Sequence, residues 1–137
     1  MIVTGWATTV GVIGWSLGGG HGPLAPGYGL GVDNILEATI VLANATVLTV
    51  NANQNADLFW ALRGGGGSNW GILTSITIKS YPIPTGGLTF WTATWAGNYC
   101  NNSQQLNTLV DAYSAWTLQQ TSKIGGFAFF TPSYTGN

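Results

Sequence analysis

Hydrophobic and polar residues alternate along three stretches near the middle of the chain, and such alternation is typical of strands. The first two, residues 35–42 and 46–50, are rich in β-branched side chains and are separated by Ala43-Asn44-Ala45. Because asparagine tolerates the left-handed backbone of a tight turn, these stretches predict a hairpin. Residues 71–81 predict a third strand. Two sets of side chains alternate along it, namely Ile72, Thr74, Ile76 and Ile78 against Leu73, Ser75, Thr77 and Lys79.

Helical patterns occur twice. Asn55-Ala56-Asp57 offers caps for a short helix over residues 58–63, which the run Gly64-Gly65-Gly66-Gly67 ends. Residues 103–120 predict a longer, amphipathic helix. Most of its apolar side chains share one face: Leu106, Leu109, Val110, Tyr113, Trp116 and Leu118.

The remaining segments predict irregular structure and two more strands. Residues 2–12 predict a short strand or a loop. Residues 18–31, which have no regular period and are interrupted by proline, predict a loop. Strands over residues 88–95 and 126–130 would flank the long helix.

The segment Pro82-Ile83-Pro84-Thr85-Gly86-Gly87 is the best candidate for a domain boundary, because paired prolines and glycines end regular elements. It divides the chain into residues 1–86 and residues 87–137. The second part would consist of a strand, a helix and a strand, which is only half of a two-layer domain. We therefore expect the chain to require further parts of a longer parent protein.

The 137 residues suit one ordinary domain, but few of them are charged. Charged residues make up 5% of the chain, against about 25% in typical soluble domains. The net charge of −1 provides no basic surface for a nucleic-acid backbone, so nucleic-acid binding is excluded. Low charge with many Asn, Thr, Gln and Ser is typical of a secreted protein, or of a segment covered by the rest of a larger protein. We favour the second interpretation for the chain and expect its parent to be secreted.

Targeting and metal signals are weak. No uninterrupted apolar run reaches the ~20 residues that span a membrane, and the N-terminus lacks the basic flank and apolar core of a signal peptide. Two sequons, Asn44-Ala45-Thr46 and Asn101-Asn102-Ser103, are open to glycosylation if the protein is secreted. The chain has one cysteine, Cys100, and one histidine, His21. These numbers exclude an internal disulfide and argue against a metal centre.

Glycines gather in two places, Gly18-Gly19-Gly20-His21-Gly22 and the run after residue 63. Backbone without Cβ atoms takes positive φ and lies directly against a flat or phosphorylated ligand, so two such loops beside apolar elements predict a cofactor cradle. The fingerprint G-x-G-x-x-G is absent and no P-loop lysine follows either run, which disfavours nicotinamide-binding Rossmann domains and P-loop enzymes. A turn-rich loop without a ligand is the alternative.

Three motifs stand in the order and at the spacing found in one group of enzymes. They are residues 11–23 (GVIGWSLGGGHGP), 28–34 (YGLGVDN) and 57–71 (DLFWALRGGGGSNWG). Together they resemble the berberine-bridge-enzyme-like FAD-linked oxidases, within the superfamily of p-cresol methylhydroxylase (PCMH) and vanillyl-alcohol oxidase. The resemblance is close over residues 5–84 and looser beyond. It implies an α+β fold, in which the C-terminal half of a PCMH-type FAD-binding domain (residues 1–86) precedes the start of an antiparallel-sheet substrate domain (residues 87–137).

The resemblance also implies which residues hold FAD. Residues 11–22 would lie along the flavin and its pyrophosphate, and the turn at Asp33 and Asn34 would pack beside the adenine end. The residues so implied are Val10, Gly11, Gly14, Gly18, Gly19, Gly20, His21, Gly22, Asp33 and Asn34. Simpler interpretations remain for three of them: His21 as a neutral packing residue, Val10 as a core valine and Asp33 as a turn former.

Two departures from the family concern how the flavin is attached. Family members hold it through a histidine in a glycine-rich stretch that would lie upstream of Gly5, and that stretch is not part of this sequence. Bicovalent members add a cysteine three residues before the valine that matches Val10, where this chain has Ala7. Alanine has no nucleophile, so the resemblance implies no thioether bond here. Cys100 lies far along the chain and does not replace that cysteine.

The resemblance implies that the parent is an FAD-dependent oxidoreductase. It would take a hydride from a small-molecule substrate (an alcohol, a sugar or a secondary metabolite) and pass the electrons to O2 to give H2O2. The chain offers no carboxylate pair or Ser–His arrangement, so no catalytic residue is assigned. Two alternatives remain: a truncated product without bound flavin, and a glycan-binding module that uses its seven tryptophans.

Overall fold

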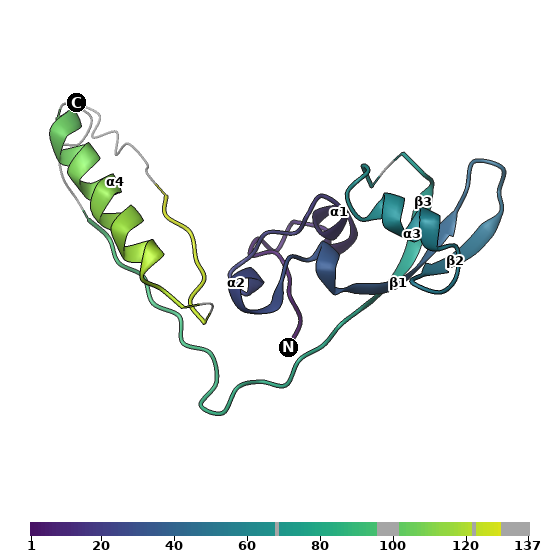
Figure 1. The fold of residues 1–137 in the computed structure, drawn as a ribbon, viewed down its shortest axis with the longest axis horizontal. Coiled ribbons are helices and arrows are strands. Elements are labelled where there is room, and N and C mark those ends of the chain that lie inside the picture. The colour runs from purple at the N-terminus through teal and green to yellow at the C-terminus, as the bar shows by residue number, and fades with distance from the viewer. Residues whose placement is uncertain (68, 96–101, 122, 130–137) are drawn as a thin grey trace.

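The structure is a computed structural model that describes residues 1–67, 69–95, 102–121 and 123–129 (Figure 1). Helices and strands are mixed along the chain, which confirms the α+β class. In chain order the elements are α1 (Val12–Leu17), α2 (Ala25–Tyr28), the 3-10 turn η1 (Val32–Asn34), β1 (Ile35–Val41), β2 (Val47–Asn51), α3 (Ala56–Leu62), β3 (Ile72–Ile78) and α4 (Ser103–Leu118).

The three strands form one antiparallel sheet in the order β2-β1-β3, so β1 lies at its centre. The predicted hairpin is confirmed, because β1 and β2 pair with Val41 opposite Val47. Across the turn, the amide of Leu42 donates to the carbonyl of Thr46 at 2.9 Å. The predicted third strand is β3, on the other side of β1.

The side chains of β3 do not divide as the strict alternation predicts. The pairing of β1 with β3 shifts register between Thr39 and Ile40, so that Ile40 lies opposite Leu73. This bulge turns Leu73 toward the core together with Ile76, whereas Ile72 is 73% exposed. One extra residue in a strand reverses the faces beyond it, and the sequence pattern alone does not reveal it.

The core lies between the sheet and the helices α1 and α3, which cover one of its faces (Figure 1). The predicted short helix is α3, which packs against β2 and ends before Arg63. On β1, Ala38 and Ile40 are buried on the covered side, whereas Glu37, Thr39 and Val41 on the opposite side are only partly buried. The buried cluster comprises Leu17, Ile35, Ala38, Ile40, Val50, Phe59 and Leu62.

Two predicted strands are wrong where the structure describes them. Residues 88–95 and 126–129 have irregular backbone, because neither segment finds a strand to pair with among the described residues; residue 130 lies outside them. Residues 2–11 form a loop, as one of the two interpretations predicted. The predicted loop over residues 18–31 contains the short helix α2, which carries a proline in its first turn, where the fixed backbone of that residue is tolerated.

The long helix α4 is confirmed within two residues of its expected end. Asn102 caps it, with its side-chain oxygen accepting from the amide of Gln105 at 3.1 Å. No residue of α4 is buried, and Leu118 is 88% exposed. In Figure 1 this helix stands apart from the sheet. The division at residues 86 and 87 stays a prediction. Among the described residues, no helix is long and apolar enough to cross a membrane.

Candidate functional site

The first glycine-rich loop is built around the end of α1. Gly11 precedes the helix with an ordinary extended backbone (φ −69°, ψ 131°), and Gly18 ends it. Gly19 and Gly20 follow with φ of +107° and +77°. Residues with a Cβ rarely adopt such φ values, so these two positions require glycine for the chain to turn.

Close approach of two backbone segments fixes the second half of this loop. Gly31 donates to the carbonyl of Gly20 at 2.8 Å, and Val32 donates to that of Gly19 at 3.1 Å. A Cβ on Gly20 would lie 2.6 Å from the Cα of Gly31, and one on Gly22 would lie 2.7 Å from the carbonyl oxygen of Thr4. Packing within the chain therefore explains why Gly20 and Gly22 carry no side chain.

Gly11 and Gly14 have no such explanation within the chain. Neither has a positive φ, and a Cβ on either would meet nothing within 4 Å. Gly14 lies inside α1, where glycine is about 0.5–1 kcal/mol less favourable than alanine. The bare backbone at these two positions leaves room for a group that approaches from outside.

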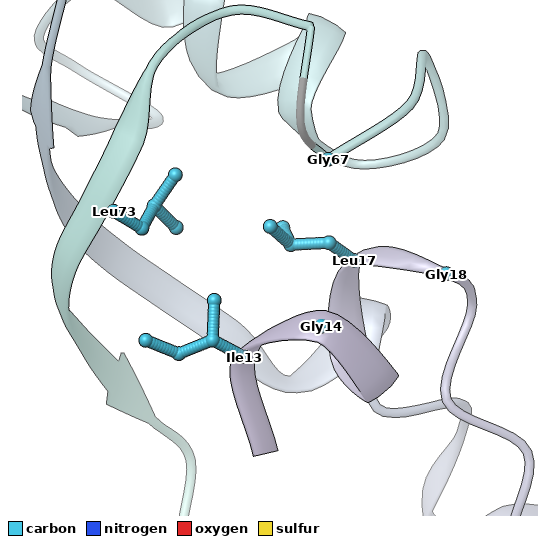
Figure 2. A pocket seen from close by; sticks show the side chains of 6 residues that line it. All are labelled: Ile13, Gly14, Leu17, Gly18, Gly67 and Leu73. Carbon is cyan, nitrogen blue, oxygen red and sulfur yellow. The ribbon is translucent and has the colours of Figure 1, made fainter. Parts of the chain in front are cut away.

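A pocket of about 290 Å³ opens beside Gly14 (Figure 2). Three aliphatic side chains point toward one another across it: Ile13 and Leu17 from α1 and Leu73 from β3. Gly14, Gly18 and Gly67 complete the lining. Because none of the described residues that line the pocket has a polar side chain, it suits an apolar group, and a charged phosphate would find only backbone among them.

Gly67 brings the second glycine run against α1. A Cβ on Gly67 would lie 2.6 Å from the Cβ of Leu17, so this contact requires glycine. Sequence reasoning did not include Gly67, Ile13, Leu17 or Leu73 among the site residues. The order of the two glycine runs was visible in the sequence, but their contact depends on how α1 and β3 pack.

Asn34 ties three segments together from a buried position, at 1% exposure. Its side-chain nitrogen donates to the carbonyl oxygens of Tyr28 and Leu30 at 3.0 and 2.7 Å. Its oxygen accepts from the hydroxyl of Tyr81 at 2.7 Å. Both amide hydrogens therefore serve the chain itself. Asp33 acts as a turn former, since its carboxylate accepts from the amide of Leu30 at 2.9 Å.

The other implied residues lie near the surface. Val10 is 48% exposed, so it is not a core valine. His21 is exposed, and its ring packs edge-on against Phe127 with 4.9 Å between centroids. Of the ten residues that the resemblance implies, the pocket brings together Gly14 and Gly18.

Ser16 is a buried residue that sequence reasoning did not single out. Its hydroxyl finds no hydrogen-bond partner in the part of the chain that the structure describes, although the residue is only 1% exposed. Within the same part, no three His, Cys, Asp or Glu side chains gather as a metal ion would require. What this site offers a ligand is therefore an apolar pocket and open backbone.

Comparison with known proteins identifies the relatives of this arrangement. The chain is 42% identical over 151 aligned residues to an FAD-linked oxidoreductase of Emericella nidulans. This alignment covers 99% of the chain and 26% of that protein. The chain is 46% identical over 107 residues to an FAD-linked oxidoreductase of Gibberella zeae, covering 71% of the chain and 19% of that protein. The homologues of this chain are FAD-linked oxidoreductases. No family profile matches the sequence.

Solved structures agree with this assignment. The BBE-like 1 protein of Physcomitrella patens is 44% identical, with a TM-score of 0.59, and the match covers 61% of this chain and 18% of the Physcomitrella chain. Glucooligosaccharide oxidase of Acremonium strictum, which carries 6-S-cysteinyl, 8α-N1-histidyl FAD, is 43% identical with a TM-score of 0.58. The match covers 61% of this chain and 17% of the Acremonium chain. The chain thus spans about a quarter or less of the relatives it matches.

The residues of this chain fit part of a flavin site. Open backbone at Gly11 and Gly14 admits a flat group at close range, and the neighbouring pocket is apolar. The turn at Gly19 and Gly20 is held in place by the hydrogen bonds to residues 31 and 32. A rigid loop with bare backbone is the feature that close approach of a dinucleotide requires.

Proposed function

We propose that this chain forms part of the FAD site of an oxidase. The observation that carries the proposal is the open space at Gly11 and Gly14, where no contact within the described chain and no positive φ calls for glycine. The identity of 42% and 46% to FAD-linked oxidoreductases supports it. A glycan-binding module does not account for this bare backbone, whereas a truncated product without flavin would have inherited it and stays the alternative.

The roles proposed for the residues follow from their positions. The backbone at Gly11 and Gly14 would lie against the cofactor, while Gly18, Gly19 and Gly20 turn the chain away from α1. Asn34 would act as a positioning residue, because it fixes the segment that hydrogen-bonds the glycine turn. Further contacts proposed from the resemblance are Val10, His21, Gly22 and Asp33.

The chemistry that bound FAD would supply is transfer of a hydride from a substrate C–H bond, followed by transfer of two electrons with two protons to O2, giving H2O2. The chain's own part is to place the cofactor and to keep its apolar side dry with Ile13, Leu17 and Leu73. Ala7, which is exposed, provides no sulfur for the cysteinyl bond named for the Acremonium enzyme. The full-length protein would therefore attach its flavin by one protein bond at most.

The substrate would be a small molecule, and a sugar, an alcohol and a secondary metabolite are the classes we propose. The similarity to glucooligosaccharide oxidase favours a carbohydrate. A panel of oligosaccharides, simple alcohols and aromatic alcohols, assayed with the full-length protein for peroxide release, separates these classes.

The test of the flavin site introduces leucine at two places in α1 of the full-length protein. Gly14→Leu fills the open space and should remove most of the bound flavin, because its side chain would occupy the approach to the backbone. Val12→Leu is the matched control on the same helix, at a position that is 39% exposed, and should keep its flavin. Flavin absorbance and circular dichroism of the purified proteins give occupancy and fold.

Gly14→Ala is the control for a folding defect in Gly14→Leu. Alanine favours the helix by about 0.5–1 kcal/mol over glycine, so a loss of flavin in Gly14→Ala cannot come from a weaker α1. Full flavin occupancy in both Gly14 variants would show that the cofactor does not approach this backbone.

A further inference from the structure

The turn between β1 and β2 is an exposed tip of the sheet. Residues 43–47 are all exposed, and Figure 1 shows this turn extending beyond the paired part of the two strands, away from α2. Two backbone hydrogen bonds close it, from Leu42 to Thr46 at 2.9 Å and from Ala45 to Leu42 at 3.0 Å. A large group attached here would meet neither α1 nor the glycine loop.

The three residues Asn44-Ala45-Thr46 at this tip form an N-glycosylation sequon. The side-chain oxygen of Asn44 accepts from the amide of Thr46 at 3.0 Å. This contact holds the asparagine while leaving its nitrogen, the atom that would be modified, without a hydrogen bond among the described residues. The hydroxyl of Thr46 likewise has no partner there, so both groups that define the sequon face solvent.

We propose that Asn44 is the acceptor of an N-linked glycan in a protein that passes through the secretory pathway. The reaction joins the side-chain nitrogen of Asn44 to the anomeric carbon of a lipid-linked oligosaccharide diphosphate. The carbon–oxygen bond to the diphosphate breaks, the lipid diphosphate leaves, and one amide proton passes to the transferase. No oxidant or reductant takes part, and the proposal does not depend on flavin binding.

Few basic residues make the site easy to map. Trypsin cuts after Arg63, Lys79 and Lys123, so Asn44 falls on the peptide that ends at Arg63. The other sequon falls on the peptide of residues 80–123 and is read separately. The full-length protein is purified both from its own cells and from the culture medium, digested, and treated with peptide N-glycosidase in 18O-labelled water. We expect conversion of Asn44 to labelled aspartate in most of the molecules.

Two substitutions at one position test the sequon in the full-length protein secreted from yeast. Thr46→Val keeps the β-branched shape but lacks the hydroxyl, and should abolish the modification. Thr46→Ser keeps the hydroxyl and should retain it. Because the backbone carbonyl of residue 46 makes the turn's hydrogen bond, both variants should fold alike. Unmodified Asn44 in the natural protein, or equal modification in the valine variant, would overturn the proposal.

Discussion

The glycines of this chain serve different physical purposes, although they look alike in the sequence. At Gly20 the conformation and the packing both require glycine, since φ is +77° and a Cβ would lie 2.6 Å from Gly31. At Gly14 neither condition holds. Gly14 lies in a helix, and its own chain leaves the space beside it open. This combination favours a ligand from outside the chain, and the proposed function therefore rests on Gly14.

Ala45 shows the reverse case, a residue with a Cβ where glycine would suit the backbone better. Its φ is +65°, a conformation about 1 kcal/mol or more unfavourable for residues with a Cβ. Ala45→Gly should therefore stabilise the full-length protein by up to about 1 kcal/mol, reduced by the greater freedom of glycine in the unfolded chain. Urea unfolding measures the change.

Ala43→Gly is the control for this prediction, because Ala43 lies in the same exposed turn without a positive φ. It should lower the stability slightly, since glycine adds freedom to the unfolded chain without relieving strain. Equal effects of the two substitutions would contradict the explanation from the left-handed backbone of Ala45.

Elements with a strong local pattern were predictable, and elements that depend on partners were not. The hairpin, α3, β3 and α4 follow from alternation, caps and amphipathic spacing. Residues 88–95 have a suitable strand sequence but no described strand to pair with, and pairing is a property of the whole fold. The site divides in the same way: the sequence located the glycine loop, but the pocket beside it depends on how β3 packs against α1.

The bulge in β3 gives a prediction about two neighbouring residues. Leu73 packs against the core, whereas Ile72 is 73% exposed, although strict alternation places Ile72 with the inward-facing Ile76. Leu73→Ala in the full-length protein should cost about 1–3 kcal/mol of unfolding free energy, because the side chain is partly buried. Ile72→Ala should change it by less than about 0.5 kcal/mol. Chemical denaturation of the two variants decides, and a larger loss for Ile72→Ala would place the bulge elsewhere.

At the scale of the whole molecule, the chain exposes more apolar surface than a free-standing domain tolerates. Trp60 is 76% exposed and Phe129 80%, and α4 buries no residue. Charged residues, which would keep such a surface soluble, make up 5% of the sequence. The chain also spans 26% or less of the two relatives described. We propose that other parts of a longer protein cover this surface.

We therefore expect residues 1–137 expressed alone to be poorly soluble and to hold no tightly bound FAD. The exposed aromatic side chains and the exposed helix α4 would associate between molecules, and we expect the chain to provide only part of the flavin site. Size-exclusion chromatography and the absorbance spectrum, with the full-length protein as reference, measure both properties. A yellow monomer that unfolds cooperatively would mean that these residues form a complete flavin-binding unit, and that the exposed apolar side chains serve a partner outside the protein.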